Sequence, residues 1–368
     1  MESKIIIPAP DPLALPAPYW LFLTLLVLTF LLHIIAMNFM FGSGILAFIA
    51  YQKSKSEEVF GRIYESIVKK IPTLMAATIT LGVAPLLFLQ VLYGQFFYTS
   101  SLIIAWPWFF VLIFLVLAYY GFYSVAFSTH KKSNLMGWIL IFSVVLVFVI
   151  GFIYSNNLTL METPQQYAVK YHEDPSGMNL NLEDPTLIPR FLHFLLASLA
   201  VGGLFIGTIG LYNWEKDNAY AKTILTFGGK WFNYSTMAQF IVGTWFMMSL
   251  PRESIRLFMG RDLTGTLSLT IGVIGAAIAI IIMSKALKSD DPRSGFKKAA
   301  WLTGLVVALM TVIREIVRES YLKTFYISHN FDVDTQWGIL IIFLVSFAGG
   351  VWLWIKMLRV YFKETATT

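Results

Sequence analysis

The chain has 368 residues, of which 57% are hydrophobic and only 13% are charged, with a net charge of +6. This composition excludes a soluble globular domain, because one core could not bury so much apolar surface. The chain contains no cysteine, which excludes disulfides, thiolate-held iron–sulfur clusters and covalent haem attachment, so any haem would be held non-covalently.

Apolar segments long enough to cross a bilayer, about 20 residues each, recur along the whole chain. They predict an all-α, polytopic membrane helical bundle that forms a single integral membrane domain over residues 1–368. About nine transmembrane helices are expected, near 19–51, 72–98, 102–128, 134–155, 188–213, 230–250, 264–285, 298–320 and 336–360. The stretch before the first helix lacks the basic region and cleavage site of a signal peptide, so this helix is expected to be retained.

The charged residues predict the orientation of these helices. With the N-terminus outside and the C-terminus inside, the inner connections at 52–71, 129–133, 214–230 and 286–298 carry much of the Lys and Arg. This is the positive-inside asymmetry, so the net charge reports topology and not nucleic-acid binding. We expect a multi-pass protein of a bacterial or archaeal cytoplasmic (inner) membrane. The outer connection 156–187 is acidic and contains Glu162, Glu173, Asp174, Glu183 and Asp184.

The five histidines differ in their predicted depth. His33, in FLLHIIAMNFMFGSG, lies near the bilayer middle, ~20 Å from the outer start of its helix at 1.5 Å per residue. His193 lies only ~10 Å below the outer face by the same measure. Isolated histidines in apolar helices suit axial ligation of haem iron, and the alternative is a buried histidine bonded to a neighbouring carbonyl. We expect His130, His172 and His329, in connections or at a helix end, to be solvated.

Small residues follow both membrane histidines in the sequence. They could leave space for a flat macrocycle, or they could serve close packing between helices. They are Gly42, Gly44 and Ala47 after His33, and Ala197, Ala200, Gly202 and Gly203 after His193.

The connection after the sixth helix, LPRESIRLFMGRD, places Arg252, Glu253 and Arg256 at the outer face. Glu253 could accept a proton from a quinol hydroxyl, and an arginine could polarise a quinone oxygen. Alternatively, these are interfacial charges whose aliphatic stems lie along apolar surface.

The eighth predicted helix ends with a second charged group. Arg314 and Arg318 lie one turn apart on one face, and Met310 lies one turn deeper. Two arginines at this depth suit haem propionates, whereas the alternative is an Arg–Glu network that ties helix ends together. Met310 lies at about the depth of His193, so we expect it to be the sixth ligand of the same iron.

The segment RFLHFLLASLAVGGLFIGTIGLYNWEKDNAYAKTIL, from Arg190 to Leu225, resembles the fifth helix and following connection of subunit I of the cytochrome bd quinol oxidases. The first helix, LLVLTFLLHIIAMNFMFGSGILAFIAY, is similar to the first helix of that family. The resemblance implies that His193 is an axial ligand of a low-spin haem b and that His33 ligates a second haem iron.

The sequence also departs from that family. The third helix, SLIIAWPWFFVLIFLVLAYYGFYSVAF, has no acid, whereas the family carries glutamates there for oxygen reduction and proton delivery. The outer quinol loop is short, the seventh helix lacks an outer methionine, and the family's G-R-x-P-W signature is absent. These departures argue against oxygen reduction and favour an electron-transferring relative.

Together, these features predict a b-type cytochrome, an oxidoreductase subunit of a respiratory chain with more than one haem b. It would oxidise menaquinol or ubiquinol at the outer face and pass electrons to a c-type cytochrome or another redox subunit outside, which the acidic surface would steer. Its other contacts would be with membrane lipid. The alternatives are a haem-free membrane anchor, a quinone-binding subunit of a respiratory complex, and a divergent bd-type terminal oxidase subunit.

Overall fold

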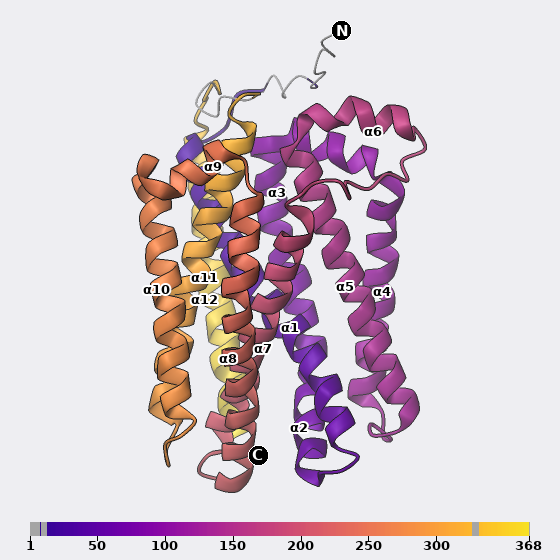
Figure 1. The fold of residues 1–368 in the computed structure, drawn as a ribbon, viewed down its shortest axis with the longest axis vertical. Coiled ribbons are helices and arrows are strands. Elements are labelled where there is room, and N and C mark those ends of the chain that lie inside the picture. The colour runs from indigo at the N-terminus through magenta and orange to yellow at the C-terminus, as the bar shows by residue number, and fades with distance from the viewer. Residues whose placement is uncertain (1–7, 9–12, 326–330, 368) are drawn as a thin grey trace.

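The computed structural model describes residues 8, 13–325 and 331–367, with only the backbone of 358–367, and this part is a bundle of helices (Figure 1). Among these residues, the β-type pairing consists of one isolated bridge between Leu15 and Val333. The helices are α1 (Tyr19–Lys53), α2 (Glu58–Val68), α3 (Ile71–Ile103), α4 (Ala105–Phe127), α5 (Asn134–Glu162), α6 (Tyr167–Glu173), α7 (Leu187–Asn213), α8 (Asn218–Ser249), α9 (Arg252–Arg256), α10 (Leu263–Ala286), α11 (Arg293–Leu322) and α12 (Trp337–Thr367), with one short turn each at η1 (Pro164–Gln166) and η2 (Leu257–Arg261).

The nine predicted spans correspond to α1, α3, α4, α5, α7, α8, α10, α11 and α12. Among the described residues, eight helical stretches are long and apolar enough to cross a membrane. The predicted span 230–250 is the exception, because α8 is long enough but contains no stretch as apolar as those of the other eight. It nevertheless runs beside α7 along the bundle (Figure 1), so the multi-pass architecture that we predicted is confirmed.

Three short helices, α2, α6 and α9, lie in segments that we had predicted to be connections. The amphipathic helix α2 lies within the inner connection 52–71 and buries Phe60, Ile63, Tyr64 and Ile67 on one face. The outer connection 156–187 contains α6. Figure 1 shows α6 and α9 at one end of the bundle, and α2 with the C-terminal end of α12 at the other. Only one face of α2 is apolar, so a pattern of 20 consecutive apolar residues does not reveal it.

Helix α7 packs against α1 and α8 through two adjacent glycines. A Cβ at Gly202 would stand 2.6 Å from the carbonyl carbon of Gly42 in α1, and a Cβ at Gly203 would stand 2.5 Å from the carbonyl oxygen of Gly228 in α8. Such close approach of backbones is typical of small residues in membrane helices. Gly42, Gly202 and Gly203 therefore serve helix packing, and the space for a macrocycle that these positions suggested is not present there.

We expect the Gly202→Ala variant to be less stable than the wild type. The added methyl must push α1 and α7 apart, and overpacking of this kind typically costs 1–3 kcal/mol. Thermal unfolding in detergent measures the change, with Gly304→Ala as the control, because a Cβ at Gly304 meets nothing within 4 Å. Equal melting temperatures for the two variants would contradict the close α1–α7 crossing.

Helix α1 contacts α3, α7 and α11. The outer halves of these helices and the outer end of α5 carry His33, Tyr93, Glu162, His193 and Arg314. Two of the remaining histidines, His130 and His172, are exposed, as expected of solvated side chains. His329 lies outside the described residues.

Candidate functional site

His33 is fixed between α1 and α3. Its Nδ1 lies 3.0 Å from the carbonyl oxygen of Thr78, to which it can donate a hydrogen bond, and a Cβ at Gly82 would stand 2.9 Å from the imidazole. The ring of Phe30 lies 6.3 Å from the imidazole, and the guanidinium of Arg314 stacks over Phe30 at 4.1 Å. With Nδ1 as the donor, Nε2 carries the lone pair that could bind iron. This geometry fits both the carbonyl-bonded histidine and the iron ligand that we considered from the sequence.

His193 occupies an equivalent position between α7 and α8. A Cβ at Gly243 of α8 would stand 3.3 Å from its Cε1. Its Nδ1 is buried and has no hydrogen-bond partner among the described protein groups. The ring of Phe246 lies 6.5 Å away, and the guanidinium of Arg190 lies 5.3 Å from the same ring. Each membrane imidazole therefore lies beside a glycine and near a phenylalanine ring, and the guanidinium of an arginine lies over the same ring.

A group of ionised residues, here called the buried charge cluster, joins the outer ends of α5, α7 and α11. Arg190 and Glu162 form an ion pair of 2.7 Å, with side chains only 7% and 2% exposed. Arg318, which is fully buried, pairs with Glu315 at 2.5 Å. Arg314 lies within electrostatic range of all four. The cluster thus consists of Glu162, Arg190, Arg314, Glu315 and Arg318.

The buried charge cluster has an excess of cations and unused hydrogen-bond donors. It holds three arginines but two glutamates. Among the described residues, the Nε and Nη2 atoms of both Arg190 and Arg318 have no hydrogen-bond partner. The ion pair between Arg190 and Glu162 is close, but its geometry is not that of a hydrogen bond to Glu162 Oε2. Burying charged donors without partners is costly. The cluster therefore has the charge and the donors to bind an anion, and a carboxylate matches the fork of an arginine.

Glu315 is already engaged on both oxygens. Arg318 binds Oε2, and the hydroxyl of Tyr93 donates to Oε1 at 2.9 Å. Helix α3 departs from helical angles at Tyr93, where φ is −134° and ψ is 28°. This pair is the Arg–Glu network considered from the sequence, and it leaves Arg314 and the remaining donors of Arg318 for another ligand.

Met310 lies at the contact between α11 and α10. A Cβ at Gly272 of α10 would stand 2.8 Å from the Met310 methyl carbon. His193 instead lies at the contact between α7 and α8. The described contacts do not bring these two residues together, so their sharing of one iron stays a prediction.

Arg252, Glu253 and Arg256 lie on α9 at the outer surface and are all exposed. The two Glu253 oxygens accept hydrogen bonds from Arg256 and Arg261, each at 2.7 Å. Under these charges lies an apolar cluster that includes Phe246, the ring beside His193. Its members include Leu250, Phe258 and Val317, with Phe246, Met247, Ile255, Ile313 and Ile316 packed against them.

The outer acidic surface is smaller than the sequence indicated. Helix α5 continues through Glu162, which is buried against Arg190 and is not a surface acid. Glu173 and Glu183 both pair with Lys170, at 3.1 and 3.4 Å. Burial alone would lower the pKa of Lys170, but these two carboxylates raise it overall, so Lys170 keeps its charge and neutralises part of the surface.

Several residues of the site were not identified from the sequence. Arg190 precedes His193 by three positions and shares its face of the helix, and this spacing is a signal that could have revealed it. Thr78, Gly82 and Gly243 carry no such signal, because only the packing of α3 and α8 brings them to the imidazoles.

No family model and no curated protein matches this chain by sequence. Among solved structures, seven chains match. One is the structure of bd oxidase from Geobacillus thermodenitrificans, with a TM-score of 0.74 and 14% sequence identity over 94% of this chain and 99% of that chain. At this identity the likeness concerns the fold. The chain is an all-α, multi-pass membrane protein with the fold of a bd oxidase chain.

Proposed function

We propose that the chain is a membrane b-type cytochrome that binds haem at His33 and His193 and carries electrons between a membrane quinol and a redox partner on the outer side. The observation that supports this most is the position of an arginine near each membrane imidazole, within a cluster that has one more cation than anions. Haem b presents an iron that binds imidazole and two propionate carboxylates that bind arginine, so it meets both requirements.

The protein groups have distinct roles in this proposal. The bond from His33 Nδ1 to Thr78 fixes the tautomer and the ring orientation, as expected for an imidazole that ligates a metal through its other nitrogen. Arg190 and Arg314 bind propionates, with Arg318 as a further donor. The haem supplies a one-electron carrier that alternates between ferric and ferrous iron.

The two histidines belong to different haems. Their surroundings differ, because His33 lies against Gly82 of α3 and His193 against Gly243 of α8. Depth does not separate them. Ser198 of α7 donates a hydrogen bond to Asn38 of α1, and each histidine lies five residues before one of these two partners. His33 and His193 therefore lie at about the same depth, and the difference of ~10 Å expected from the rise per residue is wrong.

Glu253 and the apolar cluster beneath it are the proposed quinol site. A quinol has an apolar ring and two hydroxyls, so a carboxylate above apolar side chains matches its chemistry. In this site Glu253 accepts the hydroxyl proton, while Arg252 or Arg256 polarises the oxygen. Phe246 packs against this cluster and lies beside His193, which supports a quinol site close to the haem proposed there. The partner outside is a c-type cytochrome or another redox subunit.

We expect the Glu253→Gln variant to slow haem reduction by menaquinol or ubiquinol by at least tenfold, because general bases typically contribute 10²–10⁴-fold. Stopped-flow absorbance measures this rate, and full reduction by dithionite shows that the haem is retained. The exposed Glu319→Gln variant is the control and should behave as the wild type. An unchanged quinol rate in Glu253→Gln would place quinol oxidation elsewhere.

A further inference from the structure

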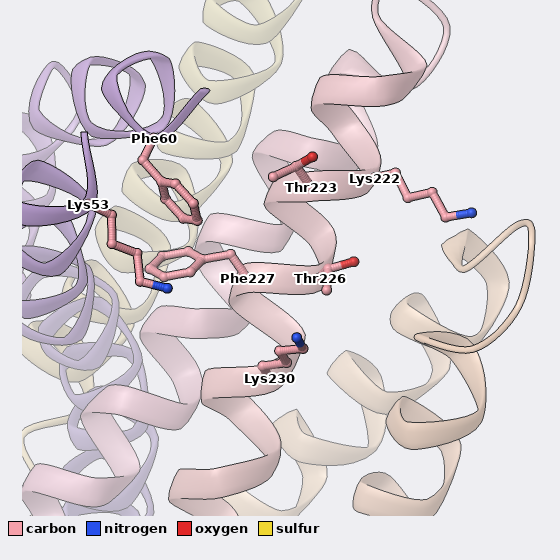
Figure 2. Close-up of a pocket in the computed structure, with 7 residues that line it drawn as sticks. All are labelled: Lys53, Phe60, Lys222, Thr223, Thr226, Phe227 and Lys230. Atoms are coloured by element: carbon pink, nitrogen blue, oxygen red, sulfur yellow. The ribbon is translucent and has the colours of Figure 1, made fainter. Parts of the chain in front are cut away.

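A pocket of about 270 Å³ opens at the inner end of the bundle, between the α1–α2 corner and α8. It has three lysines and two threonines but no acid in its lining. None of these lysines forms an ion pair with another described residue. The lining, drawn in Figure 2, consists of Lys53, Phe60, Lys222, Thr223, Thr226, Phe227 and Lys230.

The helices bring these residues together for identifiable reasons. Lys222, Thr226 and Lys230 are spaced four residues apart, so they share one face of α8. Lys53 is the last residue of α1, and its ammonium lies 4.8 Å from the Phe60 ring and 5.8 Å from the Phe227 ring. Figure 2 shows that Lys53 reaches the pocket from α1, while Lys222 extends outward at its edge. The two buried phenyl rings form the apolar wall.

We propose that this pocket binds a phosphate anion, carried by the headgroup of an anionic phospholipid or by a soluble phosphate compound. Lysine is a compact cation that suits phosphate. The hydroxyl of Thr226 can donate a hydrogen bond to a phosphate oxygen, whereas the hydroxyl of Thr223 already donates to the carbonyl of Ala219 at 3.0 Å. Basic pockets between membrane helices on the cytoplasmic side bind acidic headgroups in this way. The positive-inside rule explains why lysines are frequent on this face, but it does not explain why three of them border one acid-free pocket with an aromatic wall.

Native mass spectrometry of the purified full-length chain tests the lipid source. With phosphatidylglycerol and phosphatidylcholine of equal acyl chains, the wild type should retain phosphatidylglycerol in preference. The Lys53→Gln/Lys222→Gln/Lys230→Gln variant should retain at least tenfold less phosphatidylglycerol than the wild type. The Lys288→Gln/Lys297→Gln/Lys298→Gln variant removes the same charge from the same face, outside the pocket, and should retain the lipid.

Calorimetric titration with inorganic phosphate tests the soluble source in the same three proteins. Retention of phosphatidylglycerol that depends on the pocket lysines supports the site as a lipid site. Binding of inorganic phosphate that depends on these lysines, without a lipid preference, supports it as a site for a soluble phosphate. The proposal is wrong if the pocket variant binds both phosphatidylglycerol and inorganic phosphate as well as the wild type does. It is also wrong if the control variant loses as much binding as the pocket variant.

Discussion

Replacing His193 with Ala should remove one low-spin haem from the purified protein and leave the helical bundle folded. The helix that carries it is apolar enough to insert without the imidazole, and the haem proposed at His33 would be held by other helices. Haem content and a reduced-minus-oxidised spectrum measure the loss, with unchanged far-ultraviolet circular dichroism as evidence of folding. His33→Ala should remove a different haem, with a different spectral contribution.

The control for this experiment is His172→Ala, because His172 is exposed on α6. Its haem content and spectrum should equal those of the wild type. A His193→Ala protein with full haem content and an unchanged spectrum would show that the ligand assignment is wrong.

Replacing Arg190 with Met should both destabilise the protein and weaken haem binding near His193. The substitution leaves Glu162 buried without its cation, and breaking a buried pair in this way typically costs 3–5 kcal/mol. Thermal unfolding measures the stability, and haem retention on dilution in detergent measures the binding. Arg62→Met is the matched stability control, because Arg62 forms an exposed pair with Asp217 at 2.9 Å, and such pairs contribute about 0–1 kcal/mol.

The double variant Arg190→Met/Glu162→Leu separates a structural role of Arg190 from a role in haem binding. Replacing both partners of a buried pair by apolar residues is often neutral or stabilising, so much of the lost stability should return. Haem retention should stay reduced, because the guanidinium proposed to bind a propionate is still missing. Recovery of both properties would mean that the pair is purely structural and that the propionate is bound elsewhere.

Much of the bundle was predictable because a membrane helix must be apolar over about 20 residues, whatever its neighbours are. His33 and His193 were singled out as candidate ligands because a polar group at membrane depth is rare, and their role stays a prediction. The α8 span shows the limit of this signal, because polar residues within it pack against other helices, as where Asn233 donates a hydrogen bond to Ser284 of α10.

The surroundings of the imidazoles were not predictable, because they depend on how the helices pack. Gly202 follows His193 along α7, yet it faces α1, whereas the glycine that faces His193 lies fifty positions later in α8. Glu162 was assigned to the outer surface because the apolar run of the fourth predicted helix ends near residue 155, whereas α5 continues to Glu162. Only the packing of α5 against α7 shows that it is buried beside Arg190.

The absorption spectrum of the purified full-length chain, recorded oxidised and then reduced with dithionite, tests the central proposal most directly. The proposal predicts the sharp band of ferrous b-type haem, at a haem content above one per chain. A spectrum without a haem band, from protein produced with sufficient haem supply, would contradict it and leave a haem-free membrane subunit with the fold of a bd oxidase chain.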